Sequence, residues 1–193
     1  MWINFSYERW EPAADNARLA SAADLIMDER GVTNWGQTGR QWPAPADWLA
    51  IFRSTRALEA AGRCYLMNGQ EPERGRNIPH SARLWNIANY LLLKERCTFM
   101  HISGVQEYGK LLVYPEYEIP IGHPVGPPSE QEGVWRRAYS NGLVLVNPED
   151  TPATVVLDGS YTDDRGKAVA SPVELGPHSA AILLPVPLAR SPR

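Results

Sequence analysis

The first hundred residues alternate short apolar runs with longer segments in which apolar residues recur at helical spacing. We interpret the short runs as strands at residues 2–7, 25–28, 63–68 and 97–102, and the longer segments as helices at residues 13–23, 46–61 and 80–95. Strands that alternate with helices pair in parallel, and such a sheet is buried on both faces. The alternation therefore predicts an α/β fold built on a parallel sheet.

Prolines and one glycine mark the ends of these predicted helices. Pro12, Pro45 and Pro79 fall at or near first-turn positions, where the missing N–H group leaves no hydrogen bond unmade. Gly62 follows the alanine-rich end of the second helix, as a terminating glycine should.

A different pattern begins at about Tyr114. Residues 114–133 contain five prolines and three glycines, too many for a helix or a central strand. We expect a connector here, between an α/β part at residues 1–113 and a second domain at residues 134–193. Beyond the connector, turn signals such as Asn141-Gly142 separate short apolar runs at residues 143–146, 153–157 and 180–184. These runs predict a small antiparallel β module that packs against the α/β part.

Charge and apolar content exclude two classes of partner. The 19 Lys and Arg residues are balanced by 22 Asp and Glu residues and form no basic stripe, so nucleic acid is not an expected partner. No apolar run reaches the roughly 18 residues of a membrane helix, and the first residues lack the features of a signal peptide. We expect a soluble chain that does not bind membranes; its compartment stays open.

Cysteine and histidine give no sign of a metal or cofactor. Cys64 and Cys97 are too few for a disulfide framework and match no zinc spacing, so we interpret both as small core residues. His80, His123 and His178 lack the spacing of a metal site. We therefore predict neither a metal nor a cofactor.

Six of the seven tryptophans lie before residue 86. Trp48 and Trp85 fall at apolar positions of helices and Trp2 in a strand, and we expect Trp135 in the seam between the two parts. The others lie in predicted loops, where an indole face beside amide groups suits a sugar ring. These substrate-binding candidates are Trp10, Trp35, Trp42, Asn34 and Gln37, with Gln41 as a further amide in the same loop. The alternative is that the loop indoles only pack against the fold.

Two stretches carry a resemblance to a known family. Tyr114-Pro115-Glu116-Tyr117 and residues 122–128 precede Trp135-Arg136-Arg137-Ala138-Tyr139-Ser140 and the run NGLVLVNP at residues 141–148. Together with PHSAAILL at residues 177–184, they resemble the C-terminal part of bacterial glycoside-hydrolase-like proteins, in which a (β/α)8 barrel precedes a small β-sandwich domain. LIMDERG and NYLLLKERCTFMHI match more loosely, in the same order.

The resemblance implies that the four predicted strands are strands five to eight of a barrel whose first half is absent. Met1 would then be an internal methionine or a truncated start. The missing N-terminal half, or another chain, would cover the sheet edge at Trp2. The full-length parent would hydrolyse O-glycosyl bonds of a carbohydrate, and this chain alone would be inactive.

In a barrel the working residues lie where strands end. The strand-end candidates are Ser6, Tyr7, Glu8, Asp28, Glu29, Asn68, Gln70, Glu71, His101 and Ser103. Of these, we expect Asn68 and His101 to bind substrate. Glycoside cleavage needs two carboxyl groups. By resemblance to families that pair strands four and six, Asp28 or Glu29 would be the acid/base, and its partner would lie outside this chain. A nucleophile on strand seven fits poorly, because Asn68 stands there and Glu71 comes three residues later.

Each of these residues also has a structural interpretation. Asp28 and Glu29 could cap the next helix or pair with Arg30, and His101 could be a hydrogen-bonded core residue rather than a substrate-binding one. For the whole chain, the alternatives to a hydrolase fragment are a non-catalytic carbohydrate-binding or interaction module and a fragment that does not fold alone.

Overall fold

The computed structural model describes residues 1–5, 21–33, 41–72, 75–104, 107 and 109–186. Its first part is a four-stranded sheet in the order β1-β2-β3-β4, with every neighbouring pair parallel. The strands are β1 (Trp2–Phe5), β2 (Leu25–Asp28), β3 (Cys64–Glu71) and β4 (Thr98–Gly104). The predicted parallel α/β pattern is confirmed; β3 runs three residues beyond its predicted end.

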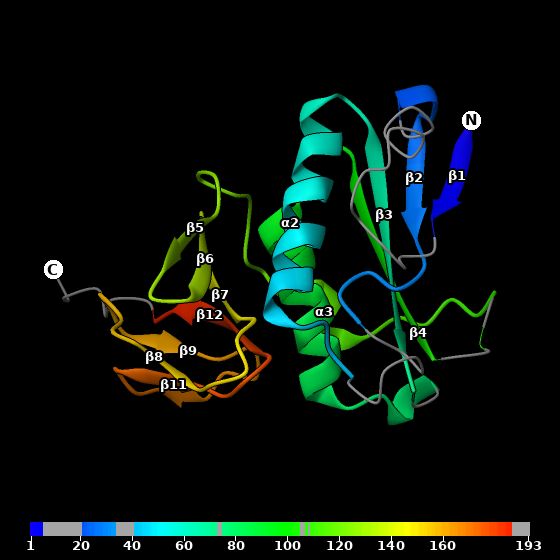
Figure 1. Ribbon diagram of the computed structural model, residues 1–193. Helices are drawn as coiled ribbons and strands as arrows, with labels where there is room; N and C mark the ends of the chain where they lie inside the picture. Colours follow the sequence, from blue (N-terminus) through cyan, green and yellow to red (C-terminus); the bar gives the residue numbers. More distant parts are fainter. Residues whose placement is uncertain (6–20, 34–40, 73–74, 105–106, 108, 187–193) are drawn as a thin grey trace, which may run out of the picture.

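Two helices cover one face of this sheet (Figure 1). They are α2 (Pro45–Ala60) and α3 (His80–Leu93), and short 3-10 helices lie at η1 (Gly75–Asn77) and η2 (Pro115–Glu118). Pro45 is the first residue of α2, and Gly62 follows its C-cap with a φ of 76°, as the sequence predicts. The predicted helix at residues 13–23 falls mainly outside the described residues.

Alternate strand residues point to opposite faces of the parallel sheet. Tyr65, Met67 and Ile102 are buried on the helix-covered face. On the other face Leu66 and His101 are half-buried and Phe99 is 52% exposed, because no described helix covers that side. Burial on both faces, as expected of a parallel sheet, is therefore only half achieved within the described residues.

The second part of the chain is antiparallel. A six-stranded sheet has the order β10-β9-β12-β7-β6-β5, and β11 pairs with β8 in a separate two-stranded sheet. The strands are β5 (Ser129–Gln131), β6 (Val134–Tyr139), β7 (Gly142–Asn147), β8 (Ala153–Val155), β9 (Tyr161–Thr162), β10 (Ala168–Val169), β11 (Val173–Leu175) and β12 (Ser179–Pro185). Short antiparallel strands after residue 134 are thus confirmed.

The proline-rich segment contributes more than a connector, since it includes η2 and the edge strand β5. Glu132 and Gly133 join β5 to β6 with φ angles of 53° and 79°, as a two-residue type I′ turn requires. The next hairpin turns at Ser140 and Asn141, and Gly142 already belongs to β7.

Helix α3 lies between the parallel sheet and the six-stranded sheet (Figure 1). The face of the six-stranded sheet toward α3 carries Tyr139, Val144 and Ile182, which share one buried cluster with the helices. Its other face forms a second cluster around Leu145 and Leu183, closed by residues of β8 and β11. The two parts of the chain therefore share a core through α3.

Tryptophans at this seam behave as the sequence predicts. Trp48 and Trp85 are fully buried. Trp135 packs on Phe52 and Trp48 at centroid distances of 4.4 and 5.7 Å. The indole Nε1 of Trp85 donates to the carbonyl of Val32, which holds the segment after β2 against α3.

The cysteine prediction is wrong. Cys64 and Cys97 form a disulfide with their Cα atoms 4.7 Å apart, and both residues are half-buried. Parallel pairing brings them together: the Tyr65 N–H donates to the Cys97 carbonyl where β3 and β4 begin. Their distance along the sequence hides a proximity that only strand register creates.

Candidate functional site

The carboxyl end of β2 places Asp28 in a closed set of hydrogen bonds. Its Oδ1 accepts the backbone N–H groups of Arg30 and Gly31 at 3.0 and 3.1 Å, and its Oδ2 accepts the Tyr65 hydroxyl at 2.9 Å. The side chain is fully buried on the helix-covered face. In this geometry the carboxylate stabilises the turn that leaves the strand.

Burial raises the pKa of the Asp28 carboxyl to about 6, while the hydrogen bonds from Arg30 and Tyr65 oppose part of that shift. A raised pKa suits a general acid, but an acid must also reach its substrate. Glu29, the next residue, is half-buried rather than enclosed. Of the two predicted acid/base residues, Glu29 therefore has the more accessible position.

Asn68 and His101 lie together on the face of the sheet that the helices leave uncovered. They are register partners on β3 and β4, and His101 Nδ1 lies 3.0 Å from Asn68 Oδ1. His101 Nε2 lies 3.3 Å from the carbonyl oxygen of Lys110. The structure thus brings together two of the predicted substrate-binding residues, and His101 is a hydrogen-bonded residue of a half-open surface.

Gln70 follows Asn68 on the same face, one step nearer to the strand end. Its register partner on β4 is Ser103, and both residues are buried. Neither the oxygen nor the nitrogen of the Gln70 amide has a hydrogen-bond partner in the described parts of the chain. Because an unpartnered buried amide is costly, this group favours a polar ligand or water at the strand ends.

Glu71 ends β3 and is fully buried. Asn86 of α3 donates to its Oε1 at 2.6 Å, and Gln41 donates to its Oε2 at 3.2 Å. A side chain at Gly69 would overlap the Asn86 amide, so glycine permits this close approach of helix and strand.

Asp28 and Glu71 do not form a carboxylate pair of the kind that cleaves glycosides. Asp28 is in register with Met67, four residues before Glu71, which separates the two Cα atoms by roughly 13 Å along the strand. Catalytic carboxyl groups are about 5 to 9.5 Å apart. Asp28 and Glu71 are therefore too far apart to act as such a pair.

Most of the predicted aromatic site cannot be placed. Trp10, Trp35, Asn34 and Gln37 lie outside the described residues. Trp42 is half-buried, with its ring 5.3 Å from that of Trp85, so it packs against the fold.

One polar residue near the strand ends is absent from the sequence-based candidates. Asn86 of α3 binds Glu71, and it carried a usable signal, because helical spacing places it on the same apolar face as Ala82 and Leu93. Gln41, one of the predicted loop amides, donates to the other oxygen of Glu71.

The sequence comparison identifies the class of this chain as the glycoside-hydrolase-like proteins. The family model described as "Hypothetical glycosyl hydrolase family 15" matches residues 12–143, and the chain belongs to this family. This confirms the resemblance seen in the sequence. The comparison with curated proteins gave no match.

Two solved structures are similar to this chain. An α-amylase from Anoxybacillus is 11% identical with a TM-score of 0.43, and the match covers 97% of this chain and 53% of the amylase. A glycoside hydrolase family 30 subfamily 8 xylanase from Clostridium acetobutylicum is 13% identical with a TM-score of 0.37, covering 90% and 51%. The chain spans about half the length of these two proteins. Among the described residues, no helix has the length and apolar character to cross a membrane.

Proposed function

We propose that this chain supplies strands five to eight of a (β/α)8 barrel and a following β-sandwich domain, and that the completed protein hydrolyses O-glycosyl bonds of a carbohydrate. The observation that carries this proposal is the family match over residues 12–143. The polar carboxyl ends of β2, β3 and β4 support it, because barrel enzymes work at that end of the strands. In this proposal residues 1–113 belong to the barrel, residues 114–133 link the parts, and residues 134–193 form the second domain.

Glu29 takes the acid/base role in this proposal, and Asp28 holds the turn that presents it. Asn68 and His101 bind sugar hydroxyls from the sheet face, since an amide and an imidazole both donate and accept hydrogen bonds. Trp10, Trp35, Trp42, Asn34 and Gln37 supply stacking and amide contacts from the loops. The nucleophile or base lies on a strand outside this chain.

The partner that completes the site is the remaining half of the barrel. Strands β1 and β4 are both edges of the parallel sheet, and Phe99 is 52% exposed on the face without helices. Folded proteins rarely leave such edges and aromatic faces uncovered. A further set of parallel strands would pair with both edges and close over that face.

The test compares two proteins, the 193-residue chain and a longer one that includes four upstream β/α units. On nitrophenyl glycosides we expect hydrolysis only by the longer protein. Glu29→Gln should lower its kcat at least about 100-fold, and Glu174→Gln, an exposed carboxylate of β11, should leave kcat unchanged. Equal activity of the short and long proteins, or an active Glu29→Gln variant, contradicts the proposal.

A non-catalytic carbohydrate-binding module is the second candidate. Two observations favour it. Asn68, His101 and Gln70 offer neutral hydrogen-bonding groups, and the described residues at the strand ends include no suitably spaced carboxylate pair. Glycan binding that survives Asp28→Ala and Glu29→Ala but disappears in Trp35→Ala would support the binding module over the hydrolase.

A further inference from the structure

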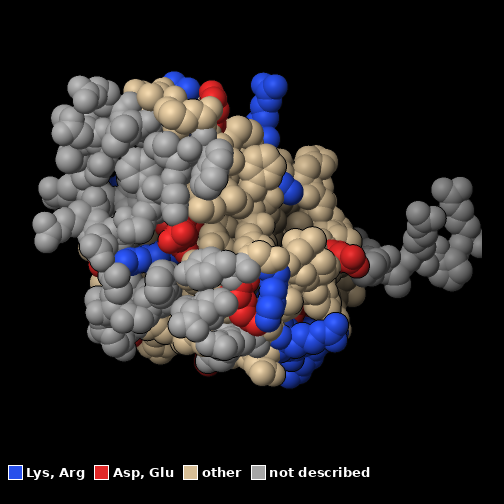
Figure 2. All heavy atoms as spheres, turned by 90° about the vertical axis from the view of Figure 1, so that its right-hand side faces the viewer, with Lys and Arg blue, Asp and Glu red and all other residues tan. Residues whose placement is uncertain are grey.

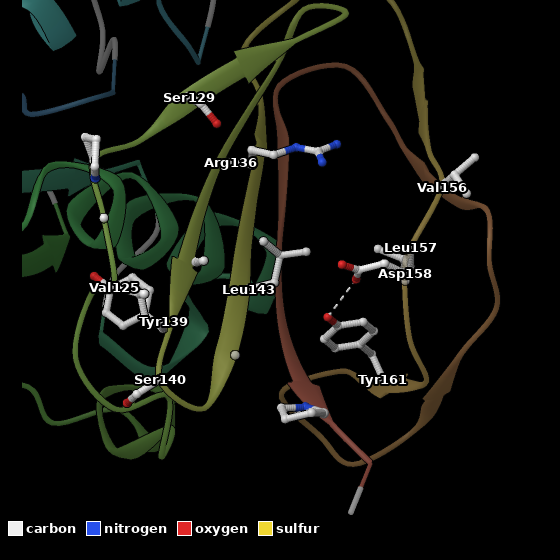
Figure 3. A pocket seen from close by; sticks show the side chains of 15 residues that line it. Val125, Ser129, Arg136, Tyr139, Ser140, Leu143, Val156, Leu157, Asp158 and Tyr161 are labelled. Atoms are coloured by element: carbon white, nitrogen blue, oxygen red, sulfur yellow. Dashed lines mark hydrogen bonds between the residues drawn. The ribbon is translucent and has the colours of Figure 1, made fainter.

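A groove of about 560 Å³ opens on the antiparallel part of the chain (Figure 3). Its floor is one face of the six-stranded sheet, where Ala138 is in register with Leu143 and Pro185 with Tyr161. Residues 156–158 form the facing wall. None of these residues belongs to the strand ends of the parallel sheet, so the groove is separate from the proposed catalytic site.

Arg136 projects from β6 into this groove toward the wall at residues 156–158 (Figure 3). Its Nε–H is buried and has no hydrogen-bond partner in the described parts of the chain. The adjacent Arg137 points to the opposite face, where its Nη1 donates to the carbonyls of Leu91, Leu92 and Lys94. Of two neighbouring arginines, one closes the end of α3 and the other lines the groove.

Tyr161 and Asp158 lie across the groove from β6 (Figure 3). The Tyr161 hydroxyl donates to Asp158 Oδ1 at 3.2 Å. Burial and the neighbouring Asp158 carboxylate raise the pKa of Tyr161, so the phenol keeps its proton at neutral pH. The pair presents an aromatic ring and, beside it, an exposed carboxylate that can accept further hydrogen bonds.

These groups together select the chemistry of a ligand. A guanidinium only donates hydrogen bonds and a carboxylate only accepts them, so a molecule that satisfies both must offer acceptors as well as donors; hydroxyl groups supply both. Leu143, Pro185 and the Tyr161 ring add an apolar floor, which suits the C–H face of a sugar ring. A ligand rich in negative charge would be repelled by Asp158, and a purely apolar one would bury Arg136 without a partner.

We propose that this groove is a second carbohydrate-binding site, which holds neutral sugar units of a polysaccharide between Arg136 and Tyr161. The ligand class rests in part on the proposed function, whereas the position and residues of the site do not. Its volume lies within the range of about 300 to 1,000 Å³ that ligand sites occupy. The site would hold a polymer on the antiparallel part of the chain and leave bond cleavage to the strand ends.

The experiment is affinity gel electrophoresis of the 193-residue chain in gels that contain glycogen, a mixed-linkage β-glucan, xylan or polygalacturonate. We expect at least one neutral polysaccharide to retard the chain. Arg136→Gln and Tyr161→Ala should each weaken that retardation about tenfold, since each removes a charged hydrogen bond or a stacking surface. Tyr161→Phe keeps the ring and should bind within about threefold of the unchanged protein, which separates loss of stacking from misfolding. Arg165→Gln, an exposed arginine outside the groove, is the matched control and should bind normally.

Three outcomes contradict this proposal. The first is that no gel retards the chain, and the second is that Arg136→Gln and Tyr161→Ala leave the retardation unchanged. The third is that only polygalacturonate retards the chain and that Arg165→Gln also weakens this retardation. The two proposals can fail separately. Groove-dependent binding without hydrolysis by the longer protein removes the proposed function alone. Hydrolysis of nitrophenyl glycosides with unchanged retardation in the groove variants removes only the second site.

Discussion

The parallel sheet and the six-stranded antiparallel sheet of this chain are covered in different ways. The six-stranded sheet has α3 on one face and residues of β8 and β11 on the other, so both faces belong to a buried cluster. The parallel sheet has helices on one face, while the other face carries the exposed Phe99 and the polar pair Asn68 and His101. Both faces of the six-stranded sheet are therefore packed within the described chain, apart from the groove beside Arg136 and Tyr161. The parallel sheet instead has one face that no described helix covers.

Figure 2 views the molecule from the side of the parallel sheet, opposite the antiparallel part. Among the atoms shown in colour, basic and acidic groups lie next to each other, and uncharged residues cover much of the rest. Such a mixture does not select a strongly charged partner.

The largest loss of stability is expected from a substitution where the two parts meet. Arg137 is buried and donates to Gly126 and Glu95 as well as to three carbonyls at the end of α3. Arg137→Ala should lower the free energy of unfolding by about 3 to 5 kcal/mol, because the acceptors lose their donor inside the protein. Urea denaturation followed by tryptophan fluorescence measures this. The matched control, Arg136→Ala, should cost less than about 1 kcal/mol; equal costs for the two variants would show that the seam does not hold the parts together.

The disulfide should stabilise the parallel part alone. It joins residues 33 apart, and closing a loop of that size constrains the unfolded chain by about 3 to 4 kcal/mol. The Cys64→Ser, Cys97→Ser double variant should therefore unfold at a lower urea concentration. Peptide mapping without reduction should recover the two cysteine peptides as one linked species. Two freely labelled thiols in the unreduced native protein would contradict the pairing.

Asp28 should make the stability of the parallel part depend on pH. Its pKa is raised from 3.8 to about 6 by burial, so folding favours the protonated form. The resulting stabilisation is complete below pH about 4 and is lost as the pH rises through about 6, by about 3 kcal/mol at most. Urea midpoints at pH 4.5 and 7.5 should differ for the unchanged protein and differ less for Asp28→Asn.

A second, half-buried carboxyl group, that of Glu59, provides the control for this pH dependence. Burial raises the pKa of Glu59 to about 7, so it acts in the same direction. Glu59→Gln should leave the part of the pH dependence that belongs to Asp28. If Asp28→Asn keeps the full slope while Glu59→Gln removes it, the burial of Asp28 does not govern stability.

The smallest effect is expected on the open face. His101→Ala removes the contacts to Asn68 and to the Lys110 carbonyl from a half-buried surface, and should cost about 1 to 2 kcal/mol. Ile102→Ala, one residue further on the helix-covered face, should cost about 2 to 5 kcal/mol. The same urea titration measures both. A cost above about 2 kcal/mol for His101→Ala would mean that this face is already packed in the isolated chain.

The spacing of apolar residues, together with the prolines and glycines at the ends of elements, was enough to predict the order of helices and strands. The apolar run at residues 25–28 matches β2, and Pro45 and Gly62 mark the ends of α2. Strands after residue 134 follow from turn residues, which act locally. What the sequence reasoning missed in the fold depends on distant pairing: β5 lies in a proline-rich segment and becomes a strand because β6 offers it an edge.

For the candidate site, the sequence predicted which residues end the strands but not how they pair. Asn68 and His101 were both candidates, and register places them in contact. The sequence could not decide between Asp28 and Glu29. Strand alternation shows that their side chains point to opposite faces of the sheet, but it does not show which face the helices cover. The hydrogen bond from Asn86 to Glu71 depends on the packing of α3 against β3, which no local sequence pattern encodes.

The amino-acid order alone established a parallel α/β part, an antiparallel part and a family resemblance, because apolar period, proline and glycine act over a few residues. Tertiary structure was needed for three further results: the Cys64–Cys97 disulfide, the enclosure of Asp28, and the opposite directions of Arg136 and Arg137. Each depends on which segments become neighbours across a sheet. That is fixed by register and by the packing of whole elements, to which residues far apart in the chain contribute jointly.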